Sequence, residues 1–208
     1  MKHMKMFGLA IAAAALTAFL GAGTASSTVL CETTVSPCPA GWDVAASTEL
    51  DFSVQSGTSL IFTDPFGSII DTCTASTMKG TTTNTGSSTT TVSGHNSVLT
   101  FGTAATPCTR PATVVTAGSF EIHHIVGTDN GTVTSTGTTV IVHNVPFFGS
   151  CQYSTNATDF GESTHHFNIR RVTVHLTLSL SSENGCPKGT WEGIYEYTGS
   201  TFFSVGAS

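Results

Sequence analysis

The sequence has few charged side chains, and basic ones are the scarcest. Its 208 residues contain seven Lys and Arg against 13 Asp and Glu, and charged residues make up 10% of the chain. A protein that binds nucleic acid needs clustered basic side chains to neutralise phosphates. We therefore expect no nucleic-acid partner.

Short enzyme motifs are also missing. The sequence contains no G-x-S-x-G, H-E-x-x-H, P-loop or dinucleotide-binding fingerprint. Glycosidase carboxylates are paired in space rather than by sequence spacing, so a secreted hydrolase stays an alternative. Glu192 and Glu196 would share one face of a strand, which we interpret as a solvated outer face. We predict no catalytic residue and no cofactor.

No hydrophobic run is long enough for a transmembrane helix, which needs roughly 20 residues. The run Phe7–Leu20 covers 14 residues, follows a basic start and precedes the small residues Gly23-Thr24-Ala25. This order predicts a secretory signal peptide over residues 1–25. We expect the mature chain, residues 26–208, to be secreted and extracellular. Its five basic and 13 acidic side chains leave a net charge of −8.

All six cysteines lie in the mature chain, and no two form a C-x-x-C pair. An even number of cysteines in an exported protein indicates disulfides rather than a zinc or redox site. Six cysteines can pair in several ways, but separations of 7, 35 and 35 residues favour sequential bridges. We predict Cys31–Cys38, Cys73–Cys108 and Cys151–Cys186.

Threonine and serine supply the polar surface that charges do not. The chain has 38 Thr and 24 Ser, and β-branched Thr favours strands. Apolar and polar residues alternate along residues 171–180 and 191–198, two strands that we expect to pair. The second strand would bury Trp191, Tyr195 and Tyr197. Frequent turn residues between such strands predict one all-β domain, an antiparallel β-sandwich or barrel-like fold stapled by disulfides.

Two turn regions can be interpreted from their residues. Asp129-Asn130-Gly131 separates two strand patterns, and Asn-Gly there predicts a tight hairpin turn with positive φ angles. The run TTTNTGSSTTT, residues 81–91, is interpreted as two exposed strands joined near Gly86.

An internal similarity links IFTDPFGSIIDTC, residues 61–73, to VIVHNVPFFGSC, residues 140–151. In each stretch an apolar strand meets a Pro-Phe turn and leads to the first cysteine of a 35-residue pair. A duplication of two halves, about residues 50–110 and 130–208, would explain this.

The stretch EIHHIVG, residues 121–127, raises the question of a metal site. Adjacent strand residues face opposite sides, so His123 and His124 cannot both bind one ion. Glu121 and His123 share a face and could hold zinc with an open position if His175 came from a neighbouring strand. We instead favour exposed outer residues and a hydrogen-bonded His124 on the inner face.

Several short stretches occur in a characteristic order: DTCTAS (71–76), KGTTTNTG (79–86), NGTVTSTG (130–137), FGSCQY (148–153) and WEGIYEY (191–197). This order resembles a group of small, exported, β-rich actinobacterial proteins with six cysteines. The chain is distantly similar to exported proteins labelled activators of alkane oxidation, some of which are associated with biofilm matrix. The resemblance rests on cysteine placement and strand order, and it implies no catalytic residues.

Taken together, these features predict an exported, non-catalytic protein of the cell surface or extracellular matrix that acts by binding or assembly, through its sheet surfaces. Its partners would be cell-surface or matrix polymers or further copies of itself. A carrier of a small ligand or metal ion is an alternative, and a secreted hydrolase is another.

Overall fold

The predicted fold class is confirmed by the computed structural model, which describes residues 28–33, 37–87, 89–128, 130–155, 159–165, 172–182, 185–199 and 204–206. These residues form antiparallel strands in sandwich-like sheets. They include no helix that is long and apolar enough to cross a membrane. The predicted signal peptide lies outside them. The strands are β1 (Thr28–Cys31), β2 (Glu49–Val54), β3 (Leu60–Thr63), β4 (Ile69–Cys73), β5 (Ser76–Thr82), β6 (Gly86–Ser87), β7 (Val92–Phe101), β8 (Ala112–Thr116), β9 (Ser119–His124), β10 (Gly131–Thr136), β11 (Thr139–Val145), β12 (Gly149–Thr155), β13 (Asp159–His165), β14 (Val172–Ser182), β15 (Gly189–Tyr197) and β16 (Ser204–Gly206).

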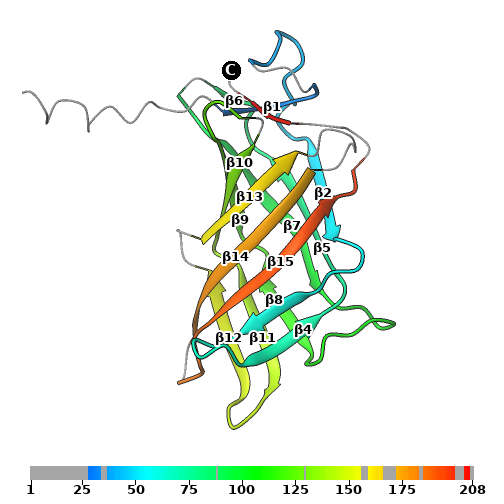
Figure 1. Cartoon of the computed structure of the whole chain (residues 1–208), viewed down its shortest axis with the longest axis vertical. Helices are drawn as coiled ribbons and strands as arrows, with labels where there is room; N and C mark the ends of the chain where they lie inside the picture. Colours follow the sequence, from blue (N-terminus) through cyan, green and yellow to red (C-terminus); the bar gives the residue numbers. More distant parts are fainter. Residues whose placement is uncertain are drawn as a thin grey trace, which may run out of the picture.

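Eight strands pair in a continuous circuit. From β15 the order runs through β2, β5, β7, β9, β10 and β13 to β14. β14 then pairs with β15, from Thr173 opposite Glu196 to Leu180 opposite Gly189. This pairing confirms the predicted hairpin between residues 171–180 and 191–198. The sheets therefore face one another across an interior, as Figure 1 shows.

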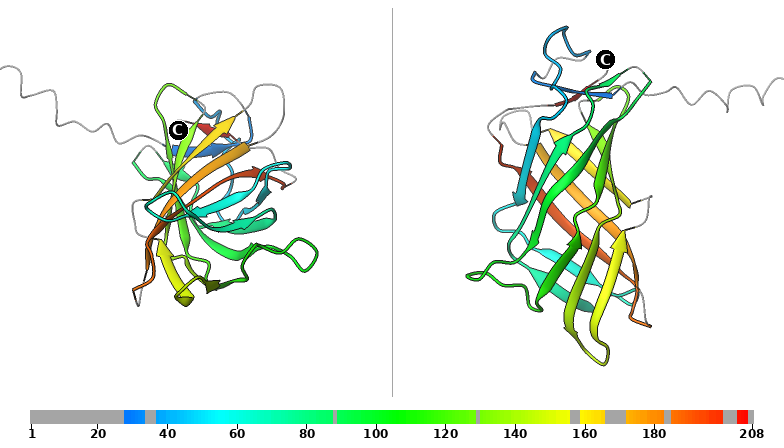
Figure 2. Two further views of the ribbon diagram at one scale, coloured as in Figure 1. Left: turned by 60° about the horizontal axis from the view of Figure 1, so that its bottom comes forward. Right: turned by 180° about the vertical axis from the view of Figure 1, so that it is seen from behind.

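Two hairpins extend one end of this circuit. β3 pairs with the start of β15, and β4 lies outside it. β12 pairs with the end of β14 and is followed outward by β11 and β8. The turns of β3–β4 (residues 64–68) and β11–β12 (residues 146–148) lie at the same end of the long axis (Figures 1 and 2). We call this the hairpin end.

The opposite end, which we call the terminal end, is covered by a small sheet of β16, β1 and β6. β1 lies between the other two strands, and its four residues are buried. The expectation of two exposed strands joined near Gly86 is wrong here, because Gly86 pairs with Val29 of β1. A Cβ atom at Gly86 would lie 1.8 Å from the carbonyl oxygen of Thr28, so only glycine fits against this strand.

Aromatic side chains fill the interior toward the hairpin end. The ring centroid of Phe62 lies 4.6 Å from that of Tyr153 and 5.6 Å from that of Trp191. The ring centroid of Phe101 lies 4.7 Å from that of Trp191. Trp191 and Tyr195 are both buried, as is Tyr197, so the predicted inner face of this strand is confirmed.

All three predicted disulfides are confirmed, and the described residues contain no free cysteine. Cys31–Cys38 joins β1 to the following loop. Cys73–Cys108 joins the end of β4 to the loop before β8, and Cys151–Cys186 joins β12 to the connection between β14 and β15. Such bridges indicate a non-reducing environment.

The predicted hairpin is confirmed, because β9 pairs with β10, but its predicted tight turn at Asn130-Gly131 is wrong. β9 ends at His124 and β10 begins at Gly131, so the two strands are not joined by a two-residue turn. Among the described residues of this connection, Gly127 has a positive φ angle, 81°. Gly131 instead pairs with His124, and a Cβ atom there would lie 3.0 Å from the Val205 side chain. The glycine therefore serves close packing against β16 rather than the turn.

The two similar stretches form hairpins that are not placed equivalently. In β3–β4 the first strand borders the eight-strand circuit, whereas in β11–β12 the second strand does. Both hairpins carry a Pro-Phe turn and lead to a disulfide-bonded cysteine. That the two halves, about residues 50–110 and 130–208, arose by duplication stays a prediction.

Candidate functional site

The histidine pair of β9 lies as the strand alternation predicts. Glu121 and His123 share the outer face, and Oε2 of Glu121 lies 3.6 Å from Nε2 of His123. His124 is buried on the inner face, where its Nε2 lies 2.7 Å from the carbonyl oxygen of Thr128. Its backbone N–H donates to Oγ1 of Thr28, which ties β9 to the terminal sheet. His124 is thus a hydrogen-bonded interior residue.

His175 lies three strands away from His123. The register places Thr132 opposite His123, Glu162 opposite Thr132, and His175 opposite Glu162. Neighbouring strands are about 4.8 Å apart, so His123 and His175 are separated by about 14 Å along the sheet. Zinc–ligand bonds are only about 2.0–2.2 Å long. The structure therefore brings Glu121 and His123 together but does not bring His175 to the same ion.

One group of potential metal ligands gathers elsewhere in the described part of the chain. Ligand atoms of Asp71, Cys73 and Cys108 lie within 4.8 Å of one another. The two sulfur atoms are bonded to each other and cannot act as thiolates. Oδ1 of Asp71 accepts the backbone N–H groups of Thr72 and Arg110, each at 2.8 Å. This group therefore has a structural rather than a metal-binding chemistry.

Arg110 joins the two hairpins of the hairpin end. Its guanidinium donates to the carbonyl oxygen of Ile70 in β4, and its Nε donates to the carbonyl oxygen of Asn144 in β11 at 3.1 Å. On either side, Thr109 N donates to Thr72 O and His143 N donates to Pro111 O, each at 2.9 Å. Residues 109–111 thus bridge β4 and β11 and cover an otherwise free strand edge.

The buried carboxyl group of Asp71 lies under this bridge. The side chain has no solvent exposure, and burial raises its pKa because a desolvated charge is unfavourable. The backbone hydrogen bonds from Arg110 and Thr72 and the charge of Arg110 act in the opposite direction. Burial has the larger effect, so Asp71 holds its proton more tightly than an exposed aspartate does.

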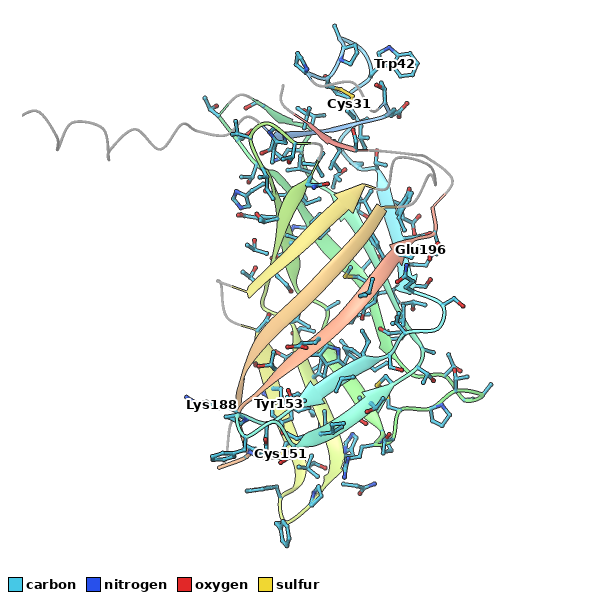
Figure 3. The ribbon with its side chains drawn as sticks, viewed as in Figure 1. Cys31, Trp42, Cys151, Tyr153, Lys188 and Glu196 are labelled. Atoms are coloured by element: carbon cyan, nitrogen blue, oxygen red, sulfur yellow. A yellow bond between two sulfur atoms is a disulfide. The ribbon has the colours of Figure 1, made fainter. Side chains whose placement is uncertain are left out.

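The hairpin end carries unusually exposed apolar side chains. Phe66 is 93% exposed and Phe147 103% exposed, each at the tip of a Pro-Phe turn. Ile69 and Phe148, beside the same turns, are 60% and 47% exposed. We call these four residues the aromatic tip. Figure 3 places this end, marked by Cys151 and Lys188, opposite Trp42 and Cys31.

Both turns of the aromatic tip are held in defined conformations. Oδ1 of Asp64 accepts the N–H groups of Phe66 and Ser68, at 2.9 and 2.8 Å. In the other turn Phe147 has a φ angle of 69°, a left-handed conformation that side chains other than glycine rarely adopt. The cost of this conformation is on the order of 1–3 kcal/mol. No packing of the Phe147 ring compensates for it, because the side chain is fully exposed.

Lys79, a basic side chain of β5, is already neutralised by neighbouring carboxylates. Nζ of Lys79 in β5 lies 3.2 Å from Oδ2 of Asp51 and 3.5 Å from Oε1 of Glu49. The hydrogen bond to Asp51 and its charge raise the pKa of Lys79. This surface network leaves the lysine engaged with its neighbours rather than with an anionic partner.

Two interior tyrosines differ in their hydrogen bonding. The hydroxyl of Tyr195 is 2.7 Å from Oγ of Ser76. The hydroxyl of Tyr153 has no partner among the described residues, and neither has Nε1 of Trp191. Burial raises the pKa of both tyrosines, that of Tyr153 to about 12. A phenol held this firmly in its neutral form is a poor proton acceptor at neutral pH.

The geometry therefore defines a disulfide-bonded, all-β protein whose most exposed aromatic side chains, Phe66 and Phe147, project from one end. In the part of the chain that the structure describes, the polar groups around Asp71 and Tyr195 bond within the interior, and Lys79 bonds to neighbouring carboxylates on the surface. Comparison of the chain with protein-family models, curated proteins and solved structures found no match.

Sequence reasoning did not identify the aromatic tip as a site. Its signal was present in the two Pro-Phe turns of residues 61–73 and 140–151, which we interpreted only as a sign of duplication. Strand alternation predicts which face a residue takes, but it does not apply to residues in a turn. The exposure of Phe66 and Phe147 therefore had to come from the structure.

Proposed function

We propose that this protein is exported and acts without catalysis, by binding a component of the cell surface or extracellular matrix through its aromatic tip. The predicted signal peptide and the three disulfides support export. The resemblance to small exported actinobacterial proteins supports the same location. The observation that carries the proposal is the exposure of Phe66 and Phe147 on ordered turns at one end of the molecule.

Such exposure is costly unless a partner covers it. An aromatic side chain presents roughly 150–250 Å² of surface, so the aromatic tip exposes on the order of 500–600 Å². Large apolar side chains exposed together at one end of a soluble protein often mark an interaction site. The aromatic residues of the strand faces are buried by comparison, as Trp191, Tyr195 and Tyr197 show. We therefore place binding at the hairpin end rather than on the sheet faces.

The test is co-sedimentation of the mature, disulfide-bonded protein with washed cell envelopes and with isolated matrix material. The double variant Phe66→Ser/Phe147→Ser removes both rings, and Trp42→Ser is a matched control because Trp42 is also exposed but lies at the terminal end. We expect the wild type and Trp42→Ser to sediment equally and the double variant to stay in solution. Equal sedimentation of all three proteins would contradict the proposal.

A further inference from the structure

We propose that the partner of the aromatic tip is a lipid surface with no net charge, into which Phe66 and Phe147 insert. This inference rests on the proposed function and names its partner. It follows from the shape of the tip, the area that it offers, and the chemistry of the residues around it.

The shape of the tip favours a deformable partner. Side chains that are 93% and 103% exposed touch almost nothing of their own chain and stand out from the turns. A folded protein would need two matching pockets to cover them, whereas acyl chains and headgroups close around any projecting ring. Aromatic and aliphatic side chains on a protein surface are the groups that bury into this boundary region.

The area of the tip is too small for a stable dimer of this protein. A specific protein interface buries about 800 Å² per partner. The aromatic tip exposes on the order of 500–600 Å², and part of it would stay uncovered between two convex surfaces. Insertion into lipid needs no such minimum, because each buried ring contributes separately.

The residues directly adjacent to the two rings in the sequence offer a carbohydrate polymer no hydrogen-bonding side chain. Phe66 lies between Pro65 and Gly67, and Phe147 follows Pro146. None of these neighbours has a polar side chain that could bond a sugar hydroxyl. The nearby carboxylate of Asp64 already accepts two backbone N–H groups of its own turn.

The charge of this end does not fit an anionic lipid. Recognition of anionic headgroups takes a cluster of about 4–8 Lys or Arg. Among the described residues near the tip, the basic ones are Lys188 and Arg110, and Arg110 bonds to two carbonyl oxygens. The expected mature net charge of −8 adds long-range repulsion from an anionic surface. Zwitterionic headgroups avoid this repulsion.

The frame behind the tip lets insertion proceed with little loss of conformational entropy. Arg110 holds β4 and β11 together, and Cys151–Cys186 fastens β12 to the connection before β15. Both rings are therefore presented from the same end before they meet the surface. Preorganised groups bind more tightly because less order has to be created on contact.

Vesicle sedimentation tests the inference. The mature protein is mixed with phosphatidylcholine vesicles, with and without added phosphatidylglycerol, at low and high salt. We expect binding to phosphatidylcholine that persists at high salt and weakens when phosphatidylglycerol is added. Phe66→Ser/Phe147→Ser should lower the affinity at least about tenfold, and Trp42→Ser should leave it unchanged. No binding of the wild type to phosphatidylcholine overturns the inference, as does binding that needs phosphatidylglycerol and disappears in salt.

A reporter variant tests insertion directly. Phe147→Trp in a Trp42→Phe background leaves the buried Trp191 as the other tryptophan. Vesicles with brominated acyl chains should quench the emission of the new indole, whereas the tryptophans of the wild-type protein, Trp42 at the terminal end and the buried Trp191, should stay unquenched. An indole at position 147 that is unquenched while the protein is sedimented with vesicles would overturn insertion.

The failure of this inference differs from the failure of the proposed function. If the double variant loses binding to cell envelopes or matrix but the wild type ignores lipid, the aromatic tip is a binding site and lipid is the wrong partner. If the wild type instead forms dimers that the double variant does not form, the tip joins copies of the chain and the lipid inference is overturned. If the double variant binds envelopes as the wild type does, the proposed function itself fails.

Discussion

The backbone N–H of Arg110 donates to Oδ1 of Asp71 at 2.8 Å, although the two residues are 39 positions apart and the carboxyl group has no solvent exposure. The Arg110 side chain also donates to the carbonyl oxygens of Ile70 and Asn144. The Cys73–Cys108 disulfide joins the same loop to the same strand. The pair therefore joins the two hairpins that carry Phe66 and Phe147. The position of the aromatic tip depends on this interior contact.

Asp71→Ala should destabilise the fold. The substitution removes the acceptor of the Thr72 and Arg110 N–H groups, and each unsatisfied buried donor costs about 1–3 kcal/mol. Asp71→Asn is the matched control, because its amide oxygen can accept the same bonds without a buried charge. Urea denaturation at neutral pH should show a lower free energy of unfolding for the alanine variant and little loss for the asparagine variant.

The same pair of proteins shows the pH dependence of Asp71. Burial raises the pKa of this carboxyl group above its ordinary value of 3.8, so the folded state binds the proton more tightly than the unfolded state. Its contribution is fully present below pH 3.8 and is lost as the pH rises through the raised pKa. The stability of the wild type relative to Asp71→Asn should therefore fall with rising pH over this range. A difference that rises with pH would show that the pKa is lowered instead.

Arg110→Ala should loosen the two hairpins from each other. The planar guanidinium reaches the carbonyl oxygens of Ile70 and Asn144 at once, and its loss leaves both acceptors without this partner. We expect a loss of about 1–3 kcal/mol in the free energy of unfolding and faster hydrogen exchange in β4 and β11. Lys188 is an exposed cation at the same end, so Lys188→Ala is the control and should change neither measurement.

Tyr195→Phe and Tyr153→Phe should have different effects on stability. Tyr195 loses a buried hydrogen bond to Ser76, which costs about 1 kcal/mol. Tyr153 has no partner among the described residues, so its replacement removes only an unsatisfied hydroxyl and should be neutral or stabilising. Thermal denaturation measures both. Because the pKa of Tyr153 is raised from 10.0 to about 12, Tyr153→Phe should also reduce the loss of stability between pH 10 and 12.

Phe147→Gly should make the protein more stable and less able to bind. Glycine adopts the positive φ angle of this position without strain, so we expect a gain of up to about 1 kcal/mol in the free energy of unfolding. Phe148, the next residue, has no positive φ angle, and Phe148→Gly should lose stability instead. Calorimetry and envelope sedimentation on the same samples separate the two effects. A stability loss in Phe147→Gly would mean that the ring supports the fold.

Local patterns in the sequence were sufficient for the disulfides and for the buried face of β15. Both depend on spacing along the chain, since Cys73 and Cys108 join neighbouring segments and Trp191, Tyr195 and Tyr197 follow strand alternation. The tight turn at Asn130-Gly131 was predicted wrongly because glycine is required at position 131 by close packing against Val205, 74 positions later. Its sequence neighbours do not show this contact.

The candidate site depends on contacts that no local pattern contains. Arg110 reaches carbonyl oxygens in β4 and β11; the predicted Cys73–Cys108 bridge brings its loop to β4, but nothing in the loop indicates β11. His123 and His175 looked equivalent in sequence because each lies on the polar face of its strand. The strands β10 and β13 lie between β9, which carries His123, and β14, which carries His175. Pairing order among distant strands, not strand identity, decided both outcomes.

The most direct test of the aromatic tip as the binding site is hydrogen–deuterium exchange of the protein, free and bound to the material with which it sediments. We predict that binding slows exchange in residues 64–69 and 145–149 and leaves residues 38–43 and the strands β5 and β7 unchanged. Protection that follows β5 and β7, with none at the two turns, would place binding on a sheet face and contradict the account.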